Sequence, residues 1–135
     1  MNVIEIREAL CEKLAEIDSN LTVYGPVPHQ PNSLPCLIVY PPDQIDYRKT
    51  RNLDVAVFPV IALVGPQDPK SQELLEALMS GEGTLSILAK LYEDRQLAGT
   101  TSNLRMLDVT SGAYTINVGA SDNVIGCEFR VEVTA

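Results

Sequence analysis

The chain has few of the residue types that enzymes usually use for catalysis. Its 135 residues include one histidine, three cysteines and no tryptophan, and aromatic residues make up 5% of the total. The histidine, His29, lies in a proline-rich segment without a nearby acidic residue. A general base normally needs a partner that orients it, so we interpret His29 as an exposed loop residue. A pairing of His29 with Cys36 is the alternative.

The three cysteines have neither the number nor the spacing of a disulfide framework or a zinc site. Cys11, Cys36 and Cys127 are odd in number, widely spaced and each surrounded by apolar residues. A disulfide framework would need an even number, and a zinc site would need close pairs such as CxxC. We expect all three to be reduced and to pack as small hydrophobic side chains. No cofactor and no metal is predicted.

Long hydrophobic runs are also missing. The longest, residues 55–64, is too short for the roughly 18–20 residues that a membrane-spanning helix needs, and it is interpreted as a buried strand. The first residues are acidic and amphipathic instead of basic and then apolar, so we expect no signal peptide and folding in a cytosol. Hydrophobic residues make up 45% of the chain, which suits one globular domain over residues 1–135.

Basic residues are few. Ten lysines and arginines against eighteen acidic residues give a net charge of −8. Binding to nucleic acid rests on neutralising phosphates with cations, so the balance argues against nucleic acid as the main partner. It suits a protein that stays dispersed until it meets a specific partner.

Helical signals occur in three places. Apolar residues at three- and four-residue spacing predict a helix over residues 3–17, capped by Asn2 with Glu5 closing a capping box. Asp68 and Pro69 are typical of the cap and first position of a second helix. A third helix is predicted within residues 84–98, ended by Gly99.

The segment "SGEG" at residues 80–83 is the best superficial candidate for a phosphate-binding loop. A Walker loop needs a lysine after its last glycine, and here Thr84 follows. A dinucleotide fingerprint follows a strand, whereas this segment follows a helix, and Glu82 would repel a phosphate. We therefore interpret the segment as a joint between two helices.

The remaining segments predict strands. They are expected at residues 21–25, 36–40 and 53–64, with Pro59 at a bulge or an edge. Residues 104–110 and 113–119 are predicted as two strands joined at Ser111–Gly112, and residues 120–123 as a turn. The last strand, residues 125–135, alternates between apolar and charged side chains. The predicted class is α+β: one domain with a mainly antiparallel or mixed sheet covered by helices, in the order α-β-β-β-α-α-β-β.

The only basic cluster lies in residues 41–52, which are predicted to form a polar loop. It consists of Tyr47, Arg48, Lys49 and Arg51. Three interpretations remain open: a site for nucleic acid with Tyr47 stacking between cations, a contact loop for an acidic surface or for a second copy of the chain, and an ordinary solvated loop. Asp43 and Asp46 lack the pattern of a calcium loop, and the cations that follow would neutralise them.

Several segments, taken in order, resemble one family. They are the opening "IREALCEKLAEI", then "YGPVPHQPNSLPCLIVYPP", "DYRKTRNLDVAVFPVIALVG", "QELLEALMSGEGTLSILAKLYEDRQLAGTTSNLRMLDV" and the closing "IGCEFRVEVTA". Together they are similar to the tail terminator, or tail-completion, proteins of long-tailed phages, and the third segment, residues 46–65, resembles the long hairpin of that family. The chain departs from the family pattern at Ala98, where the first of two glycines is expected, and this affects only the end of a helix.

The resemblance implies a structural role without catalysis. Such proteins form a ring, typically of six copies, on the head-proximal end of the tail tube, where they stop polymerisation and offer a surface to the head connector. The implied partners are other copies of the chain, the major tail tube protein and the head-completion protein, in the neck region of a virion assembled in the host cytoplasm. Tyr47, Arg48, Lys49 and Arg51 are then expected to contact a neighbouring subunit or the tube.

Other functions remain open at this point. A head-closure or neck adaptor of similar size would bind the connector and not the tube. A small cytosolic enzyme with an undetected site, or a general binding module, would belong to another class.

Overall fold

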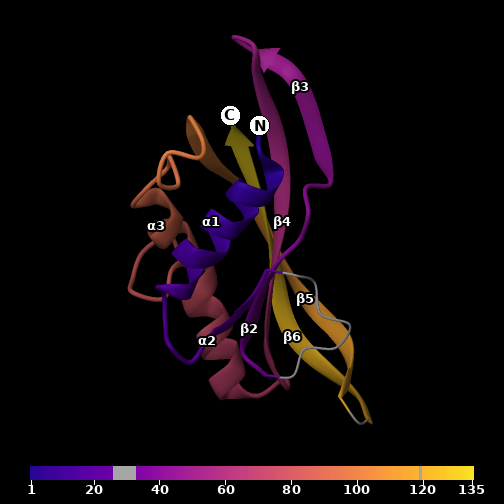
Figure 1. The fold of residues 1–135 in the computed structure, drawn as a ribbon. Coiled ribbons are helices and arrows are strands. Elements are labelled where there is room, and N and C mark those ends of the chain that lie inside the picture. The colour runs from indigo at the N-terminus through magenta and orange to yellow at the C-terminus, as the bar shows by residue number, and fades with distance from the viewer. Residues whose placement is uncertain (26–32, 119) are drawn as a thin grey trace.

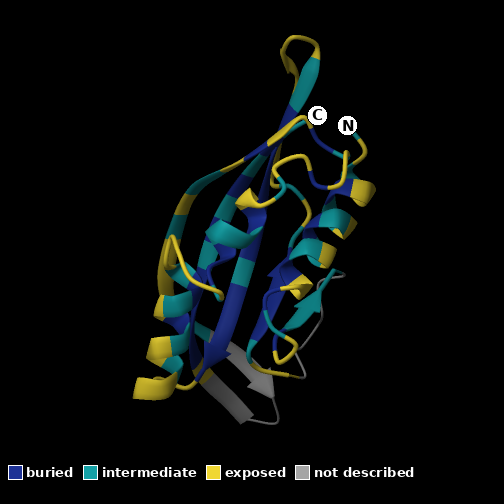
Figure 2. Ribbon diagram, turned by 90° about the vertical axis from the view of Figure 1, so that its left-hand side faces the viewer, coloured by how far each residue is buried: buried dark blue, intermediate teal, exposed yellow. Residues whose placement is uncertain are grey.

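A six-stranded mixed sheet carries three helices on one of its faces (Figures 1 and 2). The computed structural model describes residues 1–25, 33–118 and 120–135, and the side chains of these residues except within 115–122. In chain order the elements are α1 (Val3–Ala15), β1 (Thr22–Tyr24), β2 (Cys36–Val39), β3 (Gln44–Thr50), β4 (Leu53–Gly65), α2 (Pro69–Met79), α3 (Ile87–Tyr92), β5 (Asn103–Val118) and β6 (Ala120–Thr134).

The strands lie in the order β1-β2-β4-β6-β5, and β3 pairs with the part of β4 that extends beyond β2. β1 is parallel to β2, and every other pair is antiparallel. This confirms the predicted α+β class and order, with one further strand. That strand, β3, lies within residues 41–52, so the prediction of a loop there is wrong. Its side chains are mostly exposed and give no apolar alternation, because backbone pairing with β4 holds it in place.

The core lies between the helices and one face of the sheet. α1 contributes the predicted stripe, and alternate residues of β4 and β6 face it. The last strand alternates as predicted, with its charged side chains on the helix-free face. The buried side chains at the centre of this core include Ile6, Leu10, Leu14, Ala56, Phe58, Val60, Cys127, Phe129 and Val131.

Pro59 is neither at an edge nor at a bulge, as the sequence had suggested. It is buried within β4, where the neighbouring strand changes from β2, which ends opposite Val60, to β3, which begins opposite Val57. Proline cannot donate a ladder hydrogen bond, and the change of partner is the place in a central strand that tolerates this loss. The Pro59 carbonyl still accepts a hydrogen bond from the backbone of Tyr40 at 2.9 Å.

The helix caps and the glycine joint are confirmed. The side chains of Asn2 and Asp68 accept hydrogen bonds from the first turns of α1 and α2. Residues 80–86 connect α2 to α3, and Gly83 has a φ of 105° that favours glycine.

The third helix is shorter than predicted. α3 ends at Tyr92, and the Asp94 carboxylate accepts hydrogen bonds from the backbone of Gln96 and Ala98. This local turn competes with the helix, and it places Leu97 in the core.

β5 is one long strand, so the predicted turn at Ser111–Gly112 is wrong, and so is the turn at residues 120–123, which form the start of β6. Gly112 lies opposite Gly126 of β6. A Cβ at Gly126 would come within 2.2 Å of the Ala62 carbonyl oxygen, whereas a Cβ at Gly112 would meet no atom within 4 Å. A glycine is therefore required at residue 126 by the close approach of β4.

We expect Gly126→Ala to lower the free energy of unfolding by about 2–3 kcal/mol, since the clash is with backbone and no rotamer relieves it. Gly112→Ala is the matched control and should change the stability by less than about 1 kcal/mol. Urea unfolding of the two variants measures the difference. Equal effects would contradict this account of the β4–β6 contact.

Candidate subunit interface

The predicted basic cluster lies at the end of a projecting β-hairpin. We call residues 44–57, which comprise β3 and the part of β4 paired with it, the arm. In Figure 1 the arm extends past the end of the helical layer, and Figure 2 shows its tip as exposed. The four predicted residues are all exposed there, so the structure brings them together on one protrusion.

The turn of the arm uses an uncommon backbone conformation. Thr50 pairs with Leu53, and the two residues between them, Arg51 and Asn52, have φ values of 50° and 62°. Two successive positive φ values define the turn that suits the twist of a two-residue hairpin. Asparagine tolerates this conformation, whereas arginine adopts it at a cost of about 1–2 kcal/mol. Strained backbone of this kind is concentrated at functional sites.

A bulge precedes the turn and presents the cluster. Three residues of β3, namely Tyr47, Arg48 and Lys49, lie opposite the single residue Asp54 of β4, and Arg48 has a φ of 52°. A bulge re-aims the side chains of its strand. It therefore turns this part of β3 away from regular pairing and toward solvent.

Asp54 holds the bulge in place. One oxygen of its carboxylate accepts a hydrogen bond from the backbone of Arg48 at 3.0 Å, and the other accepts one from the Met1 ammonium at 3.2 Å. Its backbone makes two hydrogen bonds with Ala135, at 2.8 and 2.9 Å. The hydrogen bond from Arg48, followed by the one from the ammonium, lowers the pKa of Asp54. No sequence pattern indicated this role, because Asp54 is a single acidic residue at the start of an apolar strand.

The cations of the arm differ in whether their side chains form ion pairs or hydrogen bonds. Lys49 lies 3.5 Å from the Asp46 carboxylate, an exposed pair of small energetic value. Seven of the ten lysines and arginines have an ion pair or a side-chain hydrogen bond. Within the described part of the chain, the three without one are Arg48, Arg51 and Lys70. Two of the three free cations thus lie on the arm.

Tyr47 is the most exposed large hydrophobic side chain of the described residues, with 75% of its surface accessible. An aromatic ring beside free guanidinium groups is a common composition of contact surfaces, because both residue types are enriched among the residues that dominate binding energy. The arrangement can therefore bind an acidic surface that also offers an apolar contact.

The other candidate residues do not form a reactive centre in the described structure. Burial raises the pKa of Cys36 to about 11 and that of Cys127 to about 12, and it also raises the pKa of the half-buried Cys11 thiol. The buried thiols of Cys36 and Cys127 therefore stay protonated and are poor nucleophiles. His29 lies outside the described residues. Among the described residues, no group of three or more potential metal ligands occurs, and no helix is long and apolar enough to span a membrane.

No protein-family model matches the chain, and a search of curated proteins finds no match either.

The Asp54 contact predicts a pH dependence. Because the pKa of Asp54 is lower in the folded protein, its contribution to stability is fully present above the ordinary pKa of about 3.9 and is lost as the pH falls through the lower folded value. Asp54→Asn should therefore be less stable than the wild type near neutral pH, and the gap should close in acid. Urea unfolding over a pH series measures it.

Asp43→Asn, which changes an exposed carboxyl near the base of the arm, is the control for the general loss of one negative charge. A gap between Asp54→Asn and the wild type that stayed constant from neutral to acidic pH would contradict the role assigned to the carboxylate.

Proposed function

We propose that this protein is a tail terminator of a long-tailed phage: a ring-forming structural protein that binds the head-proximal end of the tail tube and stops its polymerisation. The observation that carries the proposal is the arm, which exposes Tyr47 and two arginines, Arg48 and Arg51, whose side chains make no ion pair or hydrogen bond among the described residues, on a chain of net charge −8. The order of segments that resemble this family supports the same assignment.

A closed ring sets a physical requirement that the chain meets. Each subunit of a ring uses two different patches, one that binds the subunit ahead and one that accepts the subunit behind. A basic arm on an acidic body supplies two patches of opposite sign. Opposite charge also speeds the encounter of copies and disfavours wrong orientations. The net negative charge meanwhile keeps free copies apart.

The proposal also places the protein in the virion. It is made in the host cytoplasm and becomes part of the tail-neck region, where its partners are other copies of itself, the major tail tube protein and the head-completion protein. It uses no cofactor and catalyses no reaction, because its role is to cover the growing end of a polymer. DNA passes through the lumen of the ring without being bound specifically.

The test is complementation of a phage that lacks this gene, with tails examined by electron microscopy. Without the protein we expect headless tails of uncontrolled length. The wild-type gene should restore normal particles. Normal tails beside unattached heads would favour a neck adaptor, and infectious particles without the gene would overturn both functions.

Charge reversal of the arm tests the part assigned to it. Arg48→Glu, Lys49→Glu and Arg51→Glu together should give a folded protein that fails to complement, since the arm can no longer bind an acidic surface. Lys70→Glu reverses the one cation outside the arm that has no ion pair or side-chain hydrogen bond among the described residues, and it should complement as the wild type does. Circular dichroism checks the fold of each variant. Full complementation by the reversed arm would contradict its role.

A further inference from the structure

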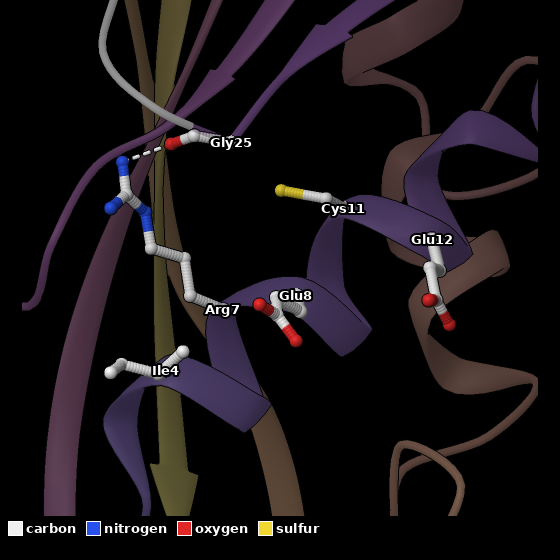
Figure 3. Close-up of a pocket in the computed structure, with 6 residues that line it drawn as sticks. All are labelled: Ile4, Arg7, Glu8, Cys11, Glu12 and Gly25. Atoms are coloured by element: carbon white, nitrogen blue, oxygen red, sulfur yellow. Dashed lines mark hydrogen bonds between the residues drawn. The ribbon is translucent and has the colours of Figure 1, made fainter.

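A pocket beside α1 has a composition that is complementary to the arm. It measures about 360 Å³ and is lined by Ile4, Arg7, Glu8, Cys11, Glu12 and Gly25. Figure 3 shows these side chains along one flank of the helix, with Arg7 reaching across to Gly25. Ile4, Glu8 and Glu12 are four residues apart and therefore follow one row of the helix surface.

The charge of this pocket is negative, although it contains an arginine. The Arg7 side chain is committed to the protein itself, since it donates to the carbonyl of Val39 at 2.8 Å and to that of Gly25. Glu8 and Glu12 are exposed at the rim, and both contribute to raising the pKa of Cys11. A partner that approaches the pocket therefore meets two carboxylates that have no ion pair within the described part of the chain.

The pocket also offers an apolar contact. Ile4 at its end is 71% exposed, and after Tyr47 it is the most exposed large hydrophobic side chain of the described residues. Tyr47 lies next to the cations Arg48 and Lys49, whereas Ile4 lines the pocket that carries Glu8 and Glu12. Two exposed apolar side chains in opposite electrostatic settings are what the two patches of a head-to-tail contact require.

We propose that this pocket accepts the arm of a second copy of the chain. The Tyr47 ring lies against Ile4 and Cys11, and the guanidinium groups of Arg48 and Arg51 face Glu8 and Glu12. The inference rests on the proposed ring and names the acceptor surface within it. α1 packs on β1, β2 and α3, whereas β3 packs on β4, so the donor and the acceptor are different surfaces of each copy, adjacent where the Met1 ammonium contacts Asp54.

Cross-linking between copies tests the contact. Lys49→Cys places a thiol on the arm and spares Tyr47, Arg48 and Arg51. In the concentrated protein, a short bismaleimide should join this thiol to Cys11 of another copy and produce a ladder of oligomers. Mass spectrometry of mixed isotope-labelled and unlabelled copies identifies links between copies. Lys49→Cys combined with Cys11→Ser should give at most dimers, and Lys70→Cys should give no ladder.

Charge exchange in the Lys49→Cys protein then tests the pairing. Reversal of the arm (Arg48→Glu with Arg51→Glu) or of the pocket (Glu8→Arg with Glu12→Arg) should each lower the yield of the Cys11 link by about tenfold. Both reversals together in one chain should restore it. If the arm and the pocket did not meet, combining the two reversals would not restore the yield of the Cys11 link.

The outcomes separate the two proposals. A ladder without links to Cys11, or a yield that the pocket reversal leaves unchanged, would overturn the pocket as acceptor. The terminator function would stand in that case if the reversed arm still failed to complement the phage. If the pocket reversal lowered the link yield but the gene were dispensable, self-association would stand and the terminator function would fall.

Discussion

The arm depends on a difference in length between two neighbouring strands. β4 has 13 residues, whereas β2, which lies beside it, has 4. The backbone groups along the rest of that edge need partners, and β3 provides them between Leu53 and Val57, on the other side of Pro59 from β2. The first residues of β4 lie near the end of β6, so β3 extends past the body of the sheet. The hairpin is thus a consequence of one overlong central strand.

Asp54 fixes the conformation in which the hairpin exposes Tyr47 and Arg48. Its backbone ties β4 to the last residue of the β6 side, and its carboxylate accepts the backbone hydrogen bond of Arg48. Without that contact, the three bulge residues of β3 that lie opposite Asp54 would not be held in one conformation. With it, Tyr47 and Arg48 are held outward on a fixed base. Binding by a preformed surface costs less conformational entropy than binding by a loose loop.

The edge strands β5 and β3 are protected from pairing with other chains in different ways. At β5, the Tyr92 hydroxyl accepts from the backbone of Met106 at 3.0 Å, and Arg95 donates to the carbonyl of Leu104 at 2.9 Å. These side chains cap part of an edge strand that could otherwise pair with another chain. At β3 the bulge and the cations of the arm oppose pairing with another strand. The same cations can still bind an acidic partner.

Sequence reasoning located the cluster correctly but not the structure that carries it. The basic run stands out because cations are scarce in this chain. The residues of β3 did not predict a strand, since its polar side chains give no alternation, and only the family resemblance implied a hairpin in residues 46–65. Gly112 suggested a turn, whereas the close approach at Gly126 becomes visible only once β4, β5 and β6 are in register. Asp54 and Ile4 were missed for the same reason, because their roles depend on contacts between distant segments.

If copies assemble through the arm, the arm is buried in the assembled protein. Hydrogen exchange, resolved by peptide, measures this directly on the free protein and on the protein bound to isolated tails. We expect slower exchange in residues 46–52 and around the start of α1 in the bound form, with the rest of the sheet unchanged. Unchanged exchange in the arm of the bound protein would show that copies do not assemble through it.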